Sequence, residues 1–196
     1  MSSTLSNDIL WRRISGAVEA IKQRMLRACA ALDAARVPHA VVGGNAVAVW
    51  VGTVDEGAIR NTRDVDLLIR RADLDAATEA LVQSGFTPAR VFGITAFLDG
   101  PDAKPSESIH LLFAGEKVQA DYTLPSPDVS ESVRPTTYSV LALEPLVRMK
   151  LTSYRRKDQV HVQDLINVGL VDATWLGRFP PQLAARLQEL LDDPHG

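Results

Sequence analysis

The sequence predicts an α/β or α+β domain with a mixed β-sheet of about five strands, flanking helices and a helical extension at the C-terminal end. Apolar residues recur at steps of three and four at both ends of the chain, which is the spacing of amphipathic helices. Short β-like runs lie between these ends, separated by glycine and proline. We expect residues 1–139 to form a core with an N-terminal helix, and residues 140–196 to pack on it as one compact unit.

Composition narrows the class of protein. The chain has 196 residues, of which 46% are hydrophobic and 23% charged, and its net charge is −3. This profile is typical of globular proteins and excludes disordered, fibrous and coiled-coil chains. The single cysteine, Cys29, excludes an internal disulfide or a cysteine-based metal cluster and favours a reducing compartment.

The same features predict where the protein acts. No apolar run approaches the roughly 18 residues of a membrane span, and the N-terminus lacks the apolar core of a signal peptide. We therefore expect a cytoplasmic protein without a membrane partner. The acidic net charge gives no overall attraction for nucleic acid, so contact with RNA or DNA would need a local basic patch.

In the N-terminal half, the pattern predicts a helix, a strand, a second helix and a second strand. An apolar stripe from Ile9 to Leu32 is typical of a core-facing helix of about 25 residues. The following elements are a buried strand at 40–42 that ends at Gly43-Gly44, a helix beginning at 45–51, an exposed loop at 52–61 and a central strand at 64–69.

The rest of the chain is predicted to add strands and then helices. We expect Asp73 to cap a helix that runs to Gly85, because aspartate accepts hydrogen bonds from free N-terminal amides. The later elements are antiparallel strands within 86–98 and 108–121, the second stretch being broken at Gly115-Glu116, and a crossing segment at 125–135. Helices follow from Leu143 onward, the last two beginning at Asp172 and Pro180-Pro181.

Tryptophan and histidine residues have simple structural interpretations. We expect Trp11, Trp50 and Trp175 to anchor the core, because large aromatic side chains bury the most apolar surface. We expect His39, His161 and His195 to be surface or packing residues.

Two carboxylates in the central strand carry the chemical argument. Asp64 and Asp66 are two residues apart, so they point to the same side of the strand and would repel each other there. A divalent cation relieves this repulsion, and Mg²⁺ typically takes one or two protein carboxylates with water and substrate phosphates. The Gly43-Gly44 pair lets backbone amides approach a phosphate, although a tight turn alone also explains the pair.

These residues resemble a known superfamily. The stretch 42–48, Val-Gly-Gly-Asn-Ala-Val-Ala, and the stretch 60–69, Arg-Asn-Thr-Arg-Asp-Val-Asp-Leu-Leu-Ile, are similar to the signature of the minimal nucleotidyltransferases of the polymerase-β-like fold. That superfamily includes toxin–antitoxin and antibiotic-modifying members. The resemblance implies a nucleotidyltransferase-like sheet and metal-dependent transfer of a nucleotidyl group from a nucleoside triphosphate such as ATP, with pyrophosphate leaving.

A second stretch extends the resemblance toward the AbiEii-like branch. Met149-Lys150-Leu151, Arg155, Lys157-Asp158 and Asp164-Leu165 resemble a helical segment of that branch, so the match covers residues 40–70 and 145–166. Nineteen residues separate Gly44 from Asp64, more than in the tightest versions of the pattern, and we place the excess in the 52–61 loop.

The superfamily pattern includes a third acid on a later strand, and here its position is open. The expected strand contains His110, a poor ligand for Mg²⁺ that softer ions accept and that could instead accept a proton. Asp121, which we place one strand further on, is the competing candidate.

The remaining site candidates each have a structural alternative. Gly43, Gly44 and Asn45 would contact the triphosphate, or only form the turn. Thr62 or Arg63 would touch phosphate, or pair with the neighbouring acids. Lys150 would contact phosphate or base, or extend to solvent.

The basic residues from 155 to 157 have the same two interpretations. They could grip an acceptor nucleic acid or the triphosphate, or form solvated surface. Asp158 and Asp164 are expected to cap or pair helices, although the resemblance places them on the active-site side.

We interpret the chain as a Mg²⁺-dependent nucleotidyltransferase, with Mn²⁺ as the other candidate metal, in which Asp64 and Asp66 hold the metal. The acceptor, which could be RNA or protein, is not indicated. The alternative is a catalytically impaired nucleotide-binding protein or toxin–antitoxin component with a partner protein, because a fold does not guarantee its chemistry. A third hypothesis is an RNA-binding module that uses residues 148–157.

Overall fold

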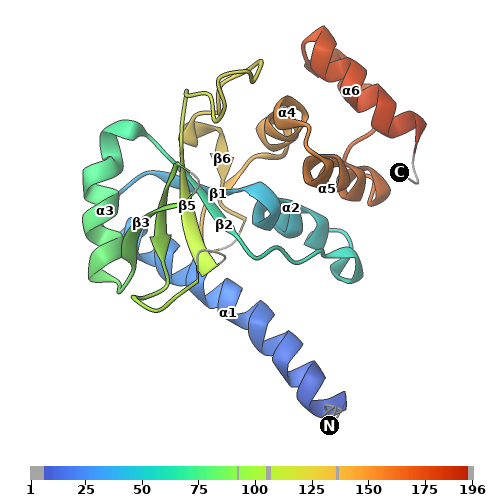
Figure 1. Cartoon of the computed structure of the whole chain (residues 1–196). Coiled ribbons are helices and arrows are strands. Elements are labelled where there is room, and N and C mark those ends of the chain that lie inside the picture. Colours follow the sequence, from blue (N-terminus) through green and yellow to red (C-terminus); the bar gives the residue numbers. More distant parts are fainter. Residues whose placement is uncertain (1–6, 92, 105–106, 136, 194–196) are drawn as a thin grey trace.

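The structure is a computed structural model that describes residues 7–91, 93–104, 107–135 and 137–193. Within these ranges, seven strands form one mixed sheet in the order β3-β4-β5-β2-β1-β7-β6 (Figure 1). Helices flank the sheet, so the predicted mixed α/β class is confirmed. The central strands carry fully buried aliphatic side chains, which is why they lie in the middle of the sheet.

The strand pairings bring three segments of the sequence to one place. The antiparallel strands β1 (His39–Val42) and β2 (Val65–Ile69) pair Val42 with Asp66. The parallel strands β2 and β5 (Ser108–Phe113) pair Asp66 with His110. The outer strands are β3 (Thr87–Val91), β4 (Ile94–Leu98), β6 (Ser132–Val133) and β7 (Val140–Leu141).

The sheet has seven strands where we expected about five. Strands β6 and β7, with two residues each, are too short to show alternation in the sequence. Strand β7 pairs in parallel with β1, so the chain returns to the sheet just before the C-terminal helices.

Six α-helices are present in the described ranges: α1 (Asn7–Ala34), α2 (Gly43–Gly52), α3 (Leu74–Gln83), α4 (Leu143–Ser153), α5 (Arg156–Asn167) and α6 (Pro181–Asp192). Helix α2 contacts α4 and α5, and α6 packs on the same two helices. Figure 1 shows α4, α5 and α6 gathered beside α2, on the far side of the molecule from α3. None of the helices in the described ranges combines the length and apolar character needed to cross a bilayer.

All three predicted helix starts are confirmed, and only the capping hydrogen bond predicted for Asp73 is absent. The Asp172 carboxylate accepts the backbone N–H of Thr174 at 2.8 Å, at the start of a 3₁₀ helix, Ala173–Arg178. Pro181 is the first residue of α6. Asp73 precedes α3 but makes no capping hydrogen bond, because a 3₁₀ turn, Arg71–Asp73, enters the helix directly and leaves Asp73 without the extended backbone of a cap.

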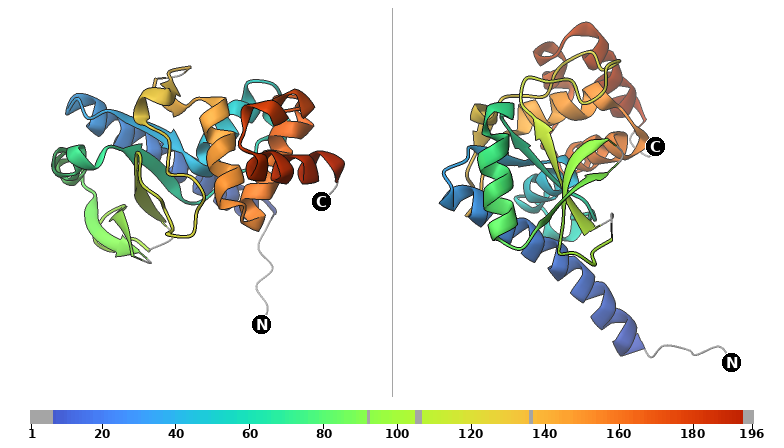
Figure 2. Two further views of the ribbon diagram at one scale, coloured as in Figure 1. Left: turned by 90° about the horizontal axis from the view of Figure 1, so that it is seen from above. Right: turned by 60° about the vertical axis from the view of Figure 1, so that its left-hand side comes forward.

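Helix α1 faces the core only in its second half. Met25, Ala28, Cys29 and Leu32 are buried, whereas Trp11 is 65% exposed. The right-hand view of Figure 2 shows the N-terminal half of α1 extending away from the body of the protein. Trp11 is therefore not a core anchor, because apolar spacing defines a face of the helix but not how far the sheet reaches beneath it.

The other tryptophans and histidines are placed as follows. Trp175 is buried, and the half-buried Trp50 donates its indole N–H to the carbonyl of Leu141 at 3.0 Å. His39 and His161 are buried, and His195 lies outside the described residues.

The strand predicted from Ser108 ends at Phe113, just before the break predicted at Gly115-Glu116. Gly115 takes a left-handed backbone (φ +73°) and turns the chain out of the sheet. Asp121 consequently lies in an exposed turn and not on a further strand.

We expect the two halves of α1 to respond differently to truncation. Leu32→Ala should lower the free energy of unfolding by about 2–5 kcal/mol, because it opens a cavity in the core. Trp11→Ala should change it by less than about 0.5 kcal/mol. Urea unfolding of both variants checks this expectation, and similar losses in both would contradict the exposed position of Trp11.

Candidate active site

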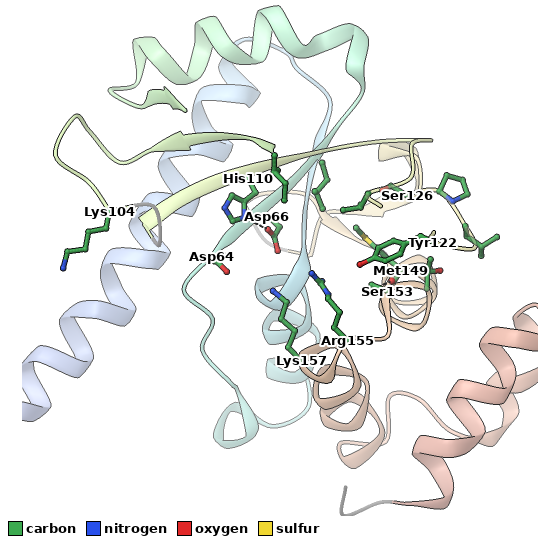
Figure 3. Close-up of a pocket in the computed structure, with 16 residues that line it drawn as sticks. Asp64, Asp66, Lys104, His110, Tyr122, Ser126, Met149, Ser153, Arg155 and Lys157 are labelled. Atoms are coloured by element: carbon green, nitrogen blue, oxygen red, sulfur yellow. Dashed lines mark hydrogen bonds and ion pairs between the residues drawn. The ribbon is translucent and has the colours of Figure 1, made fainter. Parts of the chain in front are cut away.

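The two carboxylates lie at the beginning of β2 and face a cleft. Asp64 immediately precedes the strand and Asp66 is its second residue, while Val65 between them is fully buried in the core. Both acids line the same cavity, as the strand periodicity predicts. Figure 3 shows the two side chains on the open side of the sheet, with Arg155 and Lys157 opposite them.

The glycine pair is required by the close approach of the β1–α2 turn to β2. Gly43 has a left-handed backbone (φ +69°), and a Cβ atom there would lie 2.1 Å from Oδ2 of Asp66. A Cβ atom on Gly44 would lie 2.2 Å from Cγ2 of Thr62. No side chain fits at either position without displacement, so the beginning of α2 lies directly against the carboxylates.

Two polar side chains hold the backbone of Asp64. The Asn45 amide donates to the Asp64 carbonyl at 2.7 Å, and the Thr62 hydroxyl lies 3.5 Å from the same oxygen. The Asn45 side chain lines a groove beside α1, whereas Thr62 lines the cavity beside the acids. Arg63 is exposed and makes no ion pair with a described residue.

His110 contacts Asp66 across the parallel strands. Its Nδ1–H donates to Oδ1 of Asp66 at 3.2 Å, and its Nε2 lies 3.0 Å from the hydroxyl oxygen of the buried Ser108. The hydrogen bond to Asp66 raises the pKa of His110, and burial only partly opposes this effect. Both ring nitrogens are therefore engaged by protein groups. Asp121 is exposed and does not line the cleft.

The cleft consists of two adjoining cavities that share the acid pair. The larger, of about 750 Å³, lies between β4, β5, the 118–126 segment and α4. The smaller, of about 190 Å³, extends to Gly43, Gly44 and Lys150. Arg155 and Lys157 line both cavities, so the cleft carries cations opposite its carboxylates.

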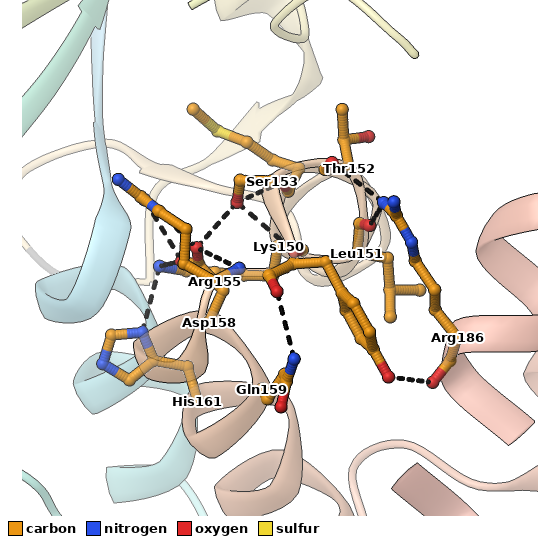
Figure 4. Close-up of polar contacts among 11 residues, drawn as sticks. Lys150, Leu151, Thr152, Ser153, Arg155, Asp158, Gln159, His161 and Arg186 are labelled. Carbon is orange, nitrogen blue, oxygen red and sulfur yellow. Dashed lines mark hydrogen bonds and ion pairs between the residues drawn. The ribbon is translucent and has the colours of Figure 1, made fainter. Parts of the chain in front are cut away.

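A buried network shapes the wall behind these cations. Asp158 is fully buried and accepts hydrogen bonds from Lys150 at 3.0 Å, Ser153 at 2.8 Å and Arg155 at 2.7 Å (Figure 4). The ammonium group of Lys150 also donates to Nδ1 of His161 at 3.0 Å. The network joins the end of α4 to the beginning of α5, which directs Arg155 and Lys157 toward the cleft.

The charges in this network shift the pKa values of its members. Burial would raise the pKa of Asp158, but Arg155 and Lys150 outweigh it and lower the pKa to about 2. Burial lowers the pKa of Lys150, and Asp158 offsets part of this effect. Burial and the neighbouring Lys150 lower the pKa of His161 to about 4.

The sequence patterns identified only some of the residues that form this wall of the cleft. Lys150 is 5% exposed. The alternative prediction, that its side chain extends to solvent, is therefore wrong. Ser153 and His161 were not identified as site residues, and only their spacing from Lys150 and Asp158 across two helices could have indicated them. Asp158 and Asp164 pair as predicted, since Asp164 accepts two hydrogen bonds of 3.0 Å from Arg60.

The donor set fits a hard, oxygen-preferring cation held partly by its substrate. The described residues contain no cluster of three or more His, Cys, Asp or Glu side chains arranged to hold a metal ion. Asp64 and Asp66 nevertheless supply adjacent carboxylates, and no hydrogen bond or ion pair from a described residue engages that of Asp64. Two carboxylates suffice for Mg²⁺ when phosphates and water complete its coordination.

Comparisons with known proteins place this fold. No protein-family model and no curated protein sequence matches the chain. The solution structure of the antibiotic-resistance factor ANT(2'')-Ia superposes with a TM-score of 0.53 at 13% identity, over 86% of this chain and 89% of that one. A Helicobacter pylori protein assigned as a nucleotidyltransferase superposes with a TM-score of 0.50 at 16% identity, over 97% of this chain and 79% of that one.

These likenesses show that the chain has a nucleotidyltransferase-like fold. At identities this low, they show the fold alone. Its assignment to the AbiEii-like branch stays a prediction.

The contact between Gly44 and Thr62 can be tested by paired substitution. Gly44→Ala should lower the free energy of unfolding by about 1–3 kcal/mol, because the new methyl group meets Cγ2 of Thr62. In a Thr62→Ser background, which lacks Cγ2, the same change should cost less. Chemical denaturation of the four proteins in the cycle measures the coupling, and equal costs in both backgrounds would contradict the contact.

The low pKa of His161 predicts a pH dependence of stability. Between about pH 6.5 and 4 the unfolded chain binds a proton that the folded chain does not, so the free energy of unfolding should fall as the pH is lowered. The loss from this residue should reach roughly 3 kcal/mol at pH 4. Denaturant titrations of the wild type and His161→Gln across this range check it: the variant should show a shallower fall, and parallel curves would contradict the assignment.

Proposed function

We propose that the protein is a metal-dependent nucleotidyltransferase, which transfers a nucleoside monophosphate from a nucleoside triphosphate to an acceptor and releases pyrophosphate. One observation carries the proposal: Asp64 and Asp66 face a cleft directly beside the beginning of α2, where only glycine fits. The nucleotidyltransferase-like fold supports the same activity.

The polyphosphate has a suitable environment in the smaller cavity. Free backbone N–H groups at a helix N-terminus favour anions, and the first turn of α2 presents them beside the acids. Lys157 makes no ion pair with a described residue, so its charge is available to a phosphate. Arg155 and Lys150 add positive potential from behind, although Asp158 already accepts hydrogen bonds from both. Thr62 lies within reach of the same cavity.

Asp64 and Asp66 would hold the metal, Mg²⁺ or Mn²⁺. When bound, the metal neutralises the phosphate charge that develops as the acceptor attacks the α-phosphorus. His110 would keep the Asp66 carboxylate oriented through its Nδ1–H, with Ser108 fixing the other side of the ring. This role needs no ligand bond from His110.

A second candidate function rests on His110. A histidine beside Asp66, where the superfamily pattern carries an acid, favours a protein that binds nucleotides without turnover, such as a toxin–antitoxin component with a partner protein. If the protein is an enzyme, its acceptor could be RNA or protein. An RNA acceptor would contact the basic residues at the beginning of α5.

The activity can be tested by label transfer. The wild type, incubated with α-labelled nucleoside triphosphates, Mg²⁺ or Mn²⁺, and total RNA or protein, should label an acceptor. Asp66→Asn should reduce the rate by about 100-fold or more, because it removes charge that stabilises the metal and the transition state. Asp75→Asn, an exposed change on α3, is the matched control.

The outcomes separate the two candidate functions. Nucleotide binding without transfer in either metal would favour the non-catalytic candidate, and absence of binding would overturn both. Asp121→Asn should retain transfer because of its exposed position. If it abolished transfer, Asp121 and not His110 would complete the site.

A further inference from the structure

The larger cavity has an apolar half that the phosphate contacts do not use. We call this half the annex. Its walls come from strands β4 and β5, the 118–126 segment and helix α4, as Figure 3 shows around Tyr122, Ser126 and Met149. The aliphatic side chains that line only the larger of the two cavities are Ile94, Val118 and Leu124, and Leu112 and Met149 line both cavities where the annex begins. Such a surface fits an uncharged ring rather than a phosphate.

Two residues that line the annex carry hydroxyl groups that are shielded from solvent and have no hydrogen-bond partner among the described residues. Ser126 is 6% exposed, and its Oγ has no partner among the described residues. The Tyr122 hydroxyl is also shielded from solvent and unpaired, and burial raises its pKa. A buried hydroxyl without a partner costs free energy in the free protein. A ligand that supplies the missing partner recovers this cost without stripping water from the hydroxyl.

The charges of the cleft restrict the ligand further. Among the described lining residues, the carboxylates are Asp64 and Asp66, which the metal would occupy. The other charged side chains, Lys104, Arg155 and Lys157, are cations. A polycationic acceptor would therefore meet repulsion in the annex, whereas an uncharged ring with hydrogen-bonding edges would not.

The order of the two cavities orients the nucleotide. The acid pair lines both cavities, whereas Gly43, Gly44 and Lys150 line only the smaller one. A triphosphate with its outer phosphates in the smaller cavity has its α-phosphorus beside the acids. The nucleoside then extends into the larger cavity, toward the annex.

We propose that the annex binds the nucleobase of the nucleoside triphosphate and that the hydroxyls of Ser126 and Tyr122 select that base. This inference rests on the proposed function and names the determinant of its nucleotide preference. Because both oxygens are shielded in the free protein, selection of the base by these hydroxyls requires the Ser126 side chain and the 118–126 segment to move when the nucleotide binds.

Calorimetric titration tests the proposal. The full-length chain is titrated with ATP, GTP, CTP and UTP, and with inorganic tripolyphosphate, which has the phosphates but no base, all with Mg²⁺. At least one nucleotide should bind more tightly than tripolyphosphate. Ser126→Ala and Tyr122→Phe should each weaken the preferred nucleotide by about 5- to 50-fold, narrow the preference among the four, and leave tripolyphosphate affinity unchanged.

A neighbouring residue and a stability measurement provide the controls. Thr123→Ala removes an exposed hydroxyl that donates to Gln182, so it should leave every affinity unchanged. The melting temperatures of Ser126→Ala and Tyr122→Phe without ligand should equal or exceed that of the wild type, because each change deletes an unpaired buried group. A structural role for the hydroxyls would lower the melting temperature instead.

Three results would overturn the proposal. Nucleotides that bind no more tightly than tripolyphosphate would show that the annex does not hold the base. Unchanged nucleotide affinities in both variants would remove the hydroxyls as determinants. Neither of these two results would contradict the proposed transfer activity. The third result, failure of all nucleotides and of tripolyphosphate to bind, would contradict both this inference and the proposed function.

Discussion

The contact between the β1–α2 turn and Asp66 is the constraint on which the site depends. Antiparallel pairing sets Val42 opposite Asp66, so the residue after Val42 must pass within van der Waals distance of that carboxylate. Only a residue without a Cβ atom, able to take a left-handed backbone, satisfies this geometry. The contact joins the beginning of α2 to the acid pair, and the cleft is built around that junction.

The charges around the cleft fall into two groups with different tasks. Lys150 and Arg155 bond to the buried Asp158, which compensates a carboxylate that burial alone would disfavour. This network orders the turn between α4 and α5. Lys157, free of such a partner among the described residues, is placed by that turn at the open side of the cleft. Buried charges thus position exposed ones.

The sequence anticipated the site where local patterns carry the information. The spacing of Asp64 and Asp66 predicted that both side chains lie on one side of the strand, and the Gly43-Gly44 pair predicted the turn that follows β1. The sequence placed His110 on the expected strand but left open whether His110 or Asp121 takes the third position, and it did not anticipate that no strand follows β5 before Asp121, so that only His110 lies beside Asp66. That outcome depends on parallel register between strands more than forty residues apart, and no local pattern records such a register.

The sequence by itself determined the mixed α/β class, the order of its principal elements and the common side of the two carboxylates, because periodicity, turn residues and the spacing of charged residues are local properties of the chain. Tertiary structure alone decided which part of α1 meets the core, the burial of Lys150 and His161 around Asp158, and the apolar annex with its unpaired hydroxyls. These features arise where distant segments exclude water from one another, so they exist only once the sheet and the C-terminal helices have packed together.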